Sequence, residues 1–259
     1  MPPPSPAYGF LGAGEITAAI VAGTHRTATE APAVFLSPRG RSVGRDLAGR
    51  FPNVHVCESN QEVLEYATSI VLAVRPENAQ PVVTELAFHP QHTLMSAVAG
   101  VRLEQLRDWA APADQIVRAI PLPQAAQAQS LTAMYPENAI ARELFSRVGD
   151  VLVPEDEAGL ATFSAATATF ATHLDYLATI VGWMTDNGVD RDTATTYITR
   201  IFGQMGQSLL QRTDCLAVLT EQHSTPGGIN EQVRTDLRSE GMPDMVRHAF
   251  DRILARLRE

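Results

Sequence analysis

Hydrophobic and polar positions divide the chain into two parts with different patterns. Between residue 7 and about residue 153, short apolar runs alternate with amphipathic stretches. We expect the apolar runs to form strands, at Ala7–Leu11, Ala33–Ser37, Val54–Cys57, Ser69–Val74, Thr93–Ala97, Ile116–Ile120, Leu131–Met134 and Asp150–Val153. We expect helices between them, at Glu15–Ala22, Arg41–Arg50, Asn60–Ala67, Ala79–Ala87, Leu103–Trp109 and Ala139–Val148. The middle strands are continuously apolar, as happens when helices cover both faces, so the pattern predicts an α/β fold with a doubly wound parallel sheet.

The second part begins after Pro154, where strand signals stop. An apolar pattern of helical period runs over residues 155–185, and Asp186-Asn187-Gly188 is a helix-stop signal. Further helices are expected from Asp190 or Asp192 to about Leu210, and over roughly 214–221, 229–238 and 242–258. The predicted domains are therefore 1–153 and an all-helical 154–259. The helical part is too thin to bury its apolar positions alone, so we expect a homodimer or a larger homo-oligomer.

The first expected strand ends in a glycine-rich turn, Gly12-Ala13-Gly14, which Glu15 and Ile16 follow at a helix start. This order is typical of a Rossmann-like βαβ unit that binds a dinucleotide. Gly12 would form the tight turn, and Gly14 would let a pyrophosphate approach the backbone at the helix N-terminus. Thr17 occupies the third position of the pattern, where Gly or Ala is usual. A glycine-rich turn in another α/β protein is the simpler alternative, but its position at the first strand favours nucleotide binding.

The end of the second expected strand carries Ser37, Arg39 and Arg41, with no acidic residue between Ala31 and Val43. An Asp or Glu here would hold the ribose 2′-hydroxyl of NAD, whereas arginines accommodate the 2′-phosphate of NADP. A solvated basic turn is the alternative explanation. We therefore expect the cofactor to be NADP, with NADPH preferred over NADH.

Three later strand ends are also candidates, because open α/β sheets bind ligands beyond the carboxyl ends of their strands. The segment Ala73-Val74-Arg75-Pro76 would direct Arg75 towards the cofactor, although a surface arginine before a helix-starting proline explains it equally well. Ala99 and Gly100 are small enough for a flat ring to lie close, although tight packing alone would explain them. Arg118 lies in an apolar strand and needs a buried partner, and two prolines stiffen the loop Pro121-Leu122-Pro123.

In the helical part, Thr225-Pro226-Gly227-Gly228 precedes a helix that begins near Ile229. Its N–H groups would form an anion site that suits a carboxylate, and Thr225 and Asn230 would add hydrogen bonds. Taken alone, an ordinary interhelical loop is the simpler interpretation.

Composition excludes several functions. All twenty basic residues are arginine, so no mechanism that needs a lysine is possible. The net charge of −9 argues against a nucleic-acid partner, and no apolar run suits a membrane span. The proline-rich N-terminus lacks an apolar h-region, so we expect a tail there and not a signal peptide. Cys57 and Cys215 are expected to be thiols in a reducing, cytoplasmic compartment, and the scattered histidines predict no metal site.

These motifs, in this order, resemble those of the pyrroline-5-carboxylate reductase family over nearly the whole chain. The family's Gly-Phe-Ile-Gly-Ala-Gly-Asn-Met-Ala is similar to Gly9–Thr17, its Ser-Asn-Arg to Ser37–Arg39, its Ala-Val-Lys-Pro to Ala73–Pro76, its Ser-x-x-Ala-Gly-Val to Ser96–Val101, its Arg-x-Met-Pro-Asn to Arg118–Leu122, and its Ser-Pro-Gly-Gly-x-Thr to Thr225–Asn230. The resemblance implies reduction of a cyclic imino acid with NAD(P)H, by default 1-pyrroline-5-carboxylate to L-proline. It also implies an intertwined helical dimerisation domain, whose loop at Thr225–Asn230 holds the substrate carboxylate in the neighbouring subunit's site.

The departures from the family pattern lie where the substrate is expected. Glu15, Leu122 and Asn230 replace Asn, Asn and Thr, and the family's Gly-Ser-Gly-Pro-Ala-Tyr is reduced to Ala166–Ala171. Two alternatives therefore stay open: a reductase of another cyclic imine in a specialised biosynthetic pathway, and a nucleotide-binding homologue without turnover.

The expected site residues fall into three groups. The catalytic candidates, which would contact the protonated imine nitrogen, are Thr225, Asn230 and Glu15. The cofactor would contact Gly12, Ala13, Gly14, Glu15, Ile16, Ser37, Arg39, Arg41, Ala73, Val74, Arg75, Pro76, Ala99 and Gly100. The substrate would contact Pro121, Leu122, Thr225, Gly227, Gly228, Ile229 and Asn230.

Overall fold

The computed structural model describes residues 6–27, 31–212 and 214–258. The chain divides into two compact units, Met1–Ser164 with Arg256–Glu259, and Ala165–Ala255. The sequence pattern placed the boundary at 153, where the strands end. The packing boundary lies later, because the first turns of the following helix bury Leu160 and Ala161 within the first unit.

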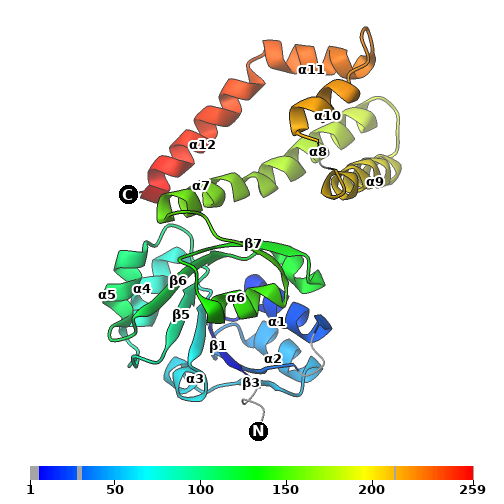
Figure 1. Cartoon of the computed structure of the whole chain (residues 1–259). Helices are drawn as coiled ribbons and strands as arrows, with labels where there is room; N and C mark the ends of the chain where they lie inside the picture. The colour runs from blue at the N-terminus through cyan, green and yellow to red at the C-terminus, as the bar shows by residue number, and fades with distance from the viewer. Residues whose placement is uncertain (1–5, 28–30, 213, 259) are drawn as a thin grey trace. The chain divides into compact units, whose positions relative to one another are not determined.

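The first unit is built on an eight-stranded sheet (Figure 1). Its strands are β1 (Ala7–Leu11), β2 (Ala33–Leu36), β3 (Val54–Val56), β4 (Ser69–Leu72), β5 (Thr93–Ser96), β6 (Gln115–Ile120), β7 (Ser130–Tyr135) and β8 (Gly149–Leu152). They lie in the order β3-β2-β1-β4-β5-β6-β7-β8. The expected α/β class with a doubly wound parallel sheet is confirmed, and the sheet departs from parallel pairing between β6 and β7, which are antiparallel. Only the short 3-10 turn η1 (Pro123–Gln127) separates these strands, whereas a parallel crossover needs about a dozen residues or more.

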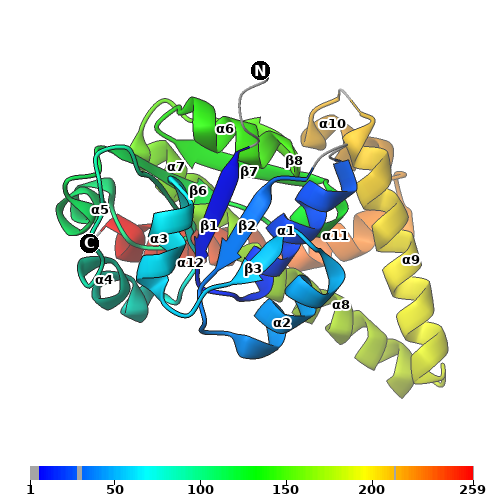
Figure 2. The ribbon, with the colours of Figure 1, turned by 90° about the horizontal axis from the view of Figure 1, so that it is seen from below.

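Helices cover both faces of the sheet (Figure 2). They are α1 (Glu15–Thr27), α2 (Arg41–Arg50), α3 (Asn60–Tyr66), α4 (Pro76–Thr84), α5 (Leu103–Ala110) and α6 (Ala139–Ser146). Successive strand residues point to opposite faces, so Phe10 joins the core beneath α1, α2 and α6, whereas Leu11 joins the core beneath α3, α4 and α5. This two-sided burial is the physical reason that the middle strands are continuously apolar.

The remaining helices are α7 (Glu157–Thr167), α8 (Thr169–Asp186), α9 (Arg191–Leu210), α10 (Leu216–Gln222), α11 (Ile229–Ser239) and α12 (Met242–Arg258). The expected single helix over 155–185 is divided at Ala168 into α7 and α8. The Thr169 hydroxyl donates to the Ala166 carbonyl at 2.8 Å, and such side-chain bonds compete with the helical ladder. Asp190 is the N-cap of α9, because its carboxylate accepts from the N–H groups of Asp192 and Thr193.

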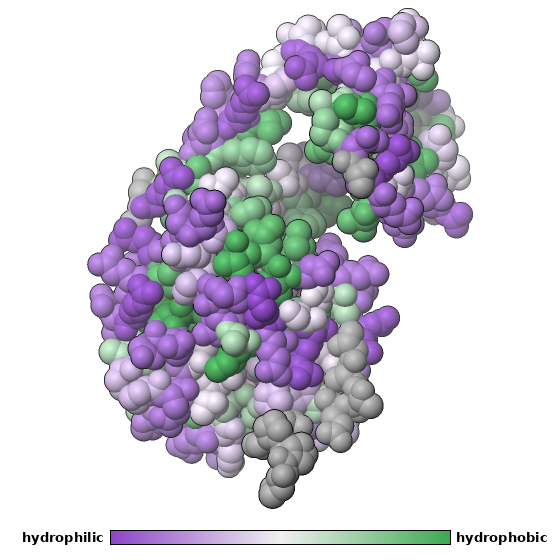
Figure 3. Space-filling model, viewed as in Figure 1, coloured by the Kyte–Doolittle hydropathy of each residue, from purple (hydrophilic) through white to green (hydrophobic). Residues whose placement is uncertain are grey.

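The helical unit buries few of its apolar side chains within one chain. Its own core is a small cluster around Val181, Ala194 and Ile198. Hydrophobic surface is visible on this unit in Figure 3. The large apolar or aromatic side chains that are exposed along its helices include Leu174, Trp183, Tyr197, Leu210, Leu216 and Ile229. No helix in the described part of the chain is both long enough and apolar enough to cross a membrane.

Candidate active site

A cavity of about 440 Å³ lies at the carboxyl ends of β1, β2 and β4. It is lined by Gly12, Ala13, Gly14, Ser37, Arg39, Gly40, Asn60, Ala73, Val74, Arg75, Asn78 and Val82. Eight of these were expected from the sequence as cofactor residues: Gly12, Ala13, Gly14, Ser37, Arg39, Ala73, Val74 and Arg75. Three other lining residues were not identified from the sequence: Gly40, Asn60 and Asn78. Each follows a parallel strand in the chain, and this location was the feature of the sequence that could have indicated them.

Gly12 makes the tight turn between β1 and α1. Its φ is +105°, and a Cβ there would lie 2.3 Å from the Ala73 carbonyl oxygen. Its N–H donates to Ser37 Oγ at 2.9 Å, which ties the turn to the end of β2. Thr17, at the third position of the glycine pattern, is buried, and its hydroxyl donates to the Gly12 carbonyl at 2.6 Å. Thr17 therefore supports the turn, and this contact explains why a residue larger than Gly or Ala is accommodated there.

Gly14 lies on the open side of the same turn. A Cβ at this position would meet no described atom within 4 Å, so the packing of this chain does not itself require glycine. The first-turn N–H groups of α1 have no partners within their helix, and they follow Gly14 directly. A bare backbone beside a helix N-terminus is the cradle that a pyrophosphate needs. The residues present therefore fit a dinucleotide.

The charge of this cavity comes from arginine. Arg39 and Arg75 both line it, no acidic side chain is among the lining residues, and within residues 6–27, 31–212 and 214–258 neither arginine has an ion-pair partner. Gly40, the next residue, packs its backbone closely against the glycine turn, because a Cβ there would lie 2.3 Å from the Ala13 carbonyl oxygen. Arg41 is the first residue of α2. It is exposed and is not among the described residues that line the cavity.

A second, smaller cavity of about 70 Å³ lies at the carboxyl ends of β5 and β6. Its walls are Ile16, Ala97, Val98, Ala99, Arg118, Ala119, Ile120, Pro121, Leu160 and Ser164. It includes the expected cofactor residues Ile16 and Ala99 and the expected substrate residue Pro121. In the sheet β4 and β5 are neighbours, so the two cavities follow one another along the same edge. Four other expected residues, Glu15, Pro76, Gly100 and Leu122, are not among the described residues that line either cavity.

The positions of these four residues are nevertheless defined. Glu15 is exposed in the first turn of α1, where a carboxylate interacts favourably with the helix dipole. Pro76 is the first residue of α4, and Gly100 has a φ of +77° in the turn after β5. Leu122 is half-buried, and its N–H donates to Ser130 Oγ at 3.2 Å.

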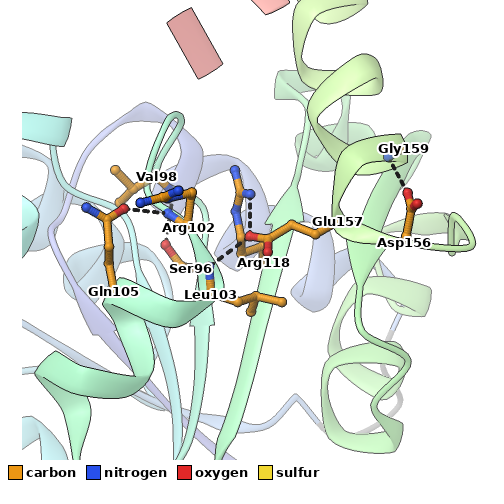
Figure 4. A network of polar contacts seen from close by, with 9 residues as sticks. All are labelled: Ser96, Val98, Arg102, Leu103, Gln105, Arg118, Asp156, Glu157 and Gly159. Carbon is orange, nitrogen blue, oxygen red and sulfur yellow. Dashed lines mark hydrogen bonds and ion pairs between the residues drawn. The ribbon is translucent and has the colours of Figure 1, made fainter. Parts of the chain in front are cut away.

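Arg118 of β6 is the charged residue of the second cavity, and it is only 5% exposed. Its Nη1 donates to Glu157 Oε1 at 2.7 Å, and the same oxygen accepts from the Leu103 N–H at 2.8 Å (Figure 4). Arg118 therefore has a partner, as expected, but this partner is not buried as expected, since the Glu157 side chain is 33% exposed. The sequence did not identify this partner, because the two residues are 39 positions apart.

The Thr225–Asn230 loop belongs to the helical unit. Gly227 has a φ of +73°, and its N–H donates to Glu231 Oε2 at 2.7 Å. The Gly228 N–H donates to the Thr225 carbonyl at 2.8 Å, and Asn230 Nδ2 donates to the His223 carbonyl at 3.1 Å. Thr225, Ile229 and Asn230 are exposed. The loop thus brings the expected substrate residues of this unit together, and one of its N–H groups already binds a carboxylate of its own chain.

Comparisons with known proteins cover both parts of the chain. Residues 7–100 match the family model for NADP oxidoreductase, coenzyme F420-dependent, and residues 157–259 match the model for pyrroline-5-carboxylate reductase dimerisation. The pyrroline-5-carboxylate reductase of Pseudomonas aeruginosa is 26% identical over 95% of this chain and 94% of its own. That of Glycine max is 28% identical over 73% of this chain and 71% of its own.

Solved structures share the fold. The 1-pyrroline-5-carboxylate reductase of Streptococcus pyogenes superposes with a TM-score of 0.82 at 20% identity, covering 97% of each chain. The Plasmodium falciparum pyrroline carboxylate reductase, solved with NADP bound, gives a TM-score of 0.79 at 16% identity, covering 97% of this chain and 96% of that one.

Proposed function

The chain belongs to the pyrroline-5-carboxylate reductase family, and from that premise we propose that it reduces 1-pyrroline-5-carboxylate to L-proline with NADPH as the preferred hydride donor. The observation that carries the proposal is the cavity at the carboxyl ends of β1, β2 and β4, where a glycine turn and two arginines meet. It occurs in a chain that aligns with reductases over nearly its full length.

The residues that line this cavity indicate how the cofactor would bind. The backbone of Gly12–Gly14 and the N-terminus of α1 would hold the pyrophosphate. Ser37 and Arg39 would contact the 2′-phosphate, and Arg75 would contact the adjacent ribose or phosphate. Arginines without acidic neighbours favour NADPH, because a 2′-phosphate adds negative charge that NADH lacks.

The reacting half of the site would lie along the edge towards β5 and β6. When bound, the reduced nicotinamide supplies the hydride. The small side chain of Ala99 after β5 would leave room for its ring, and Ile16 and Pro121 would exclude water beside it. A protonated imine is already electrophilic, so the protein mainly has to position two planar groups and bind a carboxylate.

The substrate half draws on the Thr225–Asn230 loop. The resemblance to the family implies that this loop holds the substrate carboxylate in the neighbouring subunit's site, and we propose that role for Thr225, Gly227, Gly228, Ile229 and Asn230. Thr225 and Asn230 are also the catalytic candidates for the imine nitrogen. Glu15 is the third candidate, and like Thr225 and Asn230 it is exposed and outside the described walls of both cavities.

Homo-oligomerisation accompanies this proposal. The match of residues 157–259 to a dimerisation model and the exposed apolar side chains of the helical unit both support it. We propose a homodimer as the minimal active unit.

A second candidate substrate is another cyclic imine. Leu122 places an apolar side chain after Pro121 where the family has Asn, so the part of the substrate that meets this loop would be less polar.

The test is turnover of the purified protein with 1-pyrroline-5-carboxylate, with the carboxylate-free 1-pyrroline and with a six-membered imino acid, each with NADPH and with NADH. We expect the highest kcat/KM for 1-pyrroline-5-carboxylate with NADPH. Faster turnover of another imine would favour the second candidate. NADPH binding without any turnover would identify a non-catalytic homologue, and the absence of binding of both nicotinamide cofactors would overturn the proposal.

A further inference from the structure

Arg118 has more hydrogen-bonding capacity than its surroundings use. Its Nη1 donates to Glu157, but its Nε is buried without a partner. Among the described residues, Nη2 donates no hydrogen bond either. Unlike Nε, it is not one of the fully buried atoms that lack a hydrogen-bond partner. A buried guanidinium with unsatisfied donors is unfavourable unless something else accepts from them.

The side chain lies in the wall of the second cavity. Arg118 is the only charged residue among the ten described residues that line it, and Ser164 supplies the only other polar side chain. The rest of the wall is aliphatic or proline. Arg118 is only 5% exposed, and it is one of the residues that line this cavity. A charge-assisted hydrogen bond in such an apolar enclosure is stronger than one in water.

Glu157 fixes the orientation of this guanidinium. Its Oε1 accepts from Arg118 and from the Leu103 N–H, so α7, β6 and the start of α5 meet at one carboxylate oxygen (Figure 4). The side chain of Arg118 is therefore held through Nη1, while Nη2 has no hydrogen-bond partner among the described residues and is not fully buried. This arrangement is preorganised for an acceptor that arrives from the cavity.

We propose that Arg118 donates hydrogen bonds to a planar oxygen acceptor of the bound reactants in the second cavity. The inference rests on the proposed function. A dinucleotide whose pyrophosphate lies at Gly12–Gly14 and whose adenosine lies towards β2 extends its nicotinamide end along the sheet edge towards β5 and β6. The acceptor is then either the carboxamide oxygen of the nicotinamide or the carboxylate of the substrate, both of which are sp² oxygens that suit a guanidinium.

Two variants separate ligand binding from structural support. Arg118→Gln removes the donors that face the cavity, and Glu157→Gln weakens the ion pair while Arg118 stays in place. We would measure the Kd for NADPH by fluorescence titration, the KM for 1-pyrroline-5-carboxylate and for 1-pyrroline, and the Tm of each protein. Turnover by the wild-type enzyme reports on the proposed function, whereas the comparison between variants reports on Arg118.

If the acceptor is the carboxamide, Arg118→Gln raises the Kd for NADPH about tenfold or more, and Glu157→Gln raises it much less. If the acceptor is the substrate carboxylate, the Kd for NADPH is unchanged. The KM for 1-pyrroline-5-carboxylate then rises by a similar factor, while the KM for 1-pyrroline does not change.

Equal changes of Kd or KM in Arg118→Gln and Glu157→Gln would overturn the proposal. If the ion pair were purely structural, removing either partner would have the same effect. A well-folded Arg118→Gln protein with wild-type Kd and KM values would overturn it as well. If Arg118→Gln does not fold, Arg118→Lys keeps a cation beside Glu157 but loses the planar fork. The same two constants measured on Arg118→Lys then decide: unchanged values contradict the proposal, and a rise in one of them supports it.

Discussion

Single residues determine what the cavity at the ends of β1, β2 and β4 can accept. Gly12 and Gly40 are required by the fold itself, because a Cβ at either would lie 2.3 Å from a carbonyl oxygen. Gly14 is different, since a Cβ there would meet nothing described within 4 Å. The glycine pattern in the sequence thus combines a residue that the chain needs for its turn with one, Gly14, that the packing of the described residues does not require.

Replacing Gly14 and Gly12 by alanine is expected to separate these roles. Gly14→Ala should leave the Tm close to wild type and weaken NADPH binding by at least about tenfold, because the methyl group would occupy space that the pyrophosphate needs. Gly12→Ala should lower the free energy of unfolding by about 1–3 kcal/mol, through the positive φ and the clash with Ala73. Thermal unfolding and NADPH fluorescence titration measure both. Wild-type NADPH affinity in Gly14→Ala would show that no phosphate approaches this turn.

Arg39 is expected to determine cofactor preference. Arg39→Ala should raise the Kd for NADPH by about tenfold to a hundredfold and change the Kd for NADH little, because a charge-assisted hydrogen bond contributes about 1.5–3 kcal/mol. Arg45→Ala is the matched control, since Arg45 is an exposed arginine within α2 and is not among the described residues that line the cavity. An equal loss of affinity for both cofactors would contradict a contact to the 2′-phosphate.

At the scale of elements, the periodicity of apolar positions located the strands and helices within a few residues. It did not predict where a helix is divided or which way a strand runs in the sheet. The division of 155–185 into α7 and α8 depends on a threonine hydroxyl, and the antiparallel β7 depends on a connection too short for a crossover. The pattern of apolar positions does not show how closely two elements pack either. The helix α1 approaches η1 so closely that a Cβ at Gly23 would lie 1.9 Å from the Ala125 carbonyl oxygen.

Gly23→Ala is therefore expected to destabilise the first unit. The methyl group would force α1 away from η1, at a cost of about 1–3 kcal/mol, as for other overpacked contacts. Gly49→Ala in α2 is the control, because nothing described lies within 4 Å of a Cβ there, and alanine should gain up to about 1 kcal/mol of helix propensity. Urea unfolding of both variants measures the difference. A Gly23→Ala protein as stable as Gly49→Ala would contradict the close approach.

At the scale of the whole molecule, the two units differ in how many of their apolar side chains a single chain buries. The sheet unit has an extensive core on each face, whereas the helical unit leaves large apolar side chains such as Trp183 and Leu210 exposed. Exposed apolar area of this kind, on a segment that matches a dimerisation family, indicates a surface that a second copy covers.

We expect light scattering after size exclusion to give at least twice the mass of one chain. Trp183→Glu should shift the protein towards monomer, because a carboxylate cannot be buried without a partner. Glu240→Lys, at the exposed end of α11, is the control and should keep the wild-type mass. A wild-type protein that stays monomeric at all concentrations would contradict the proposed homodimer.

The sequence by itself determined the α/β class, the order of strands and helices, the glycine turn, the arginines at the end of β2 and the change to a helical second part. These features depend on local periodicity, on the special φ of glycine and on the position of a residue at the end of a strand, all of which can be read along the chain. Only the tertiary structure brought Asn60 and Asn78 to the cavity of the glycine turn and paired Arg118 with Glu157. Such contacts depend on which strand ends and helix starts become neighbours once the sheet is assembled, and periodicity says nothing about which distant side chains then meet.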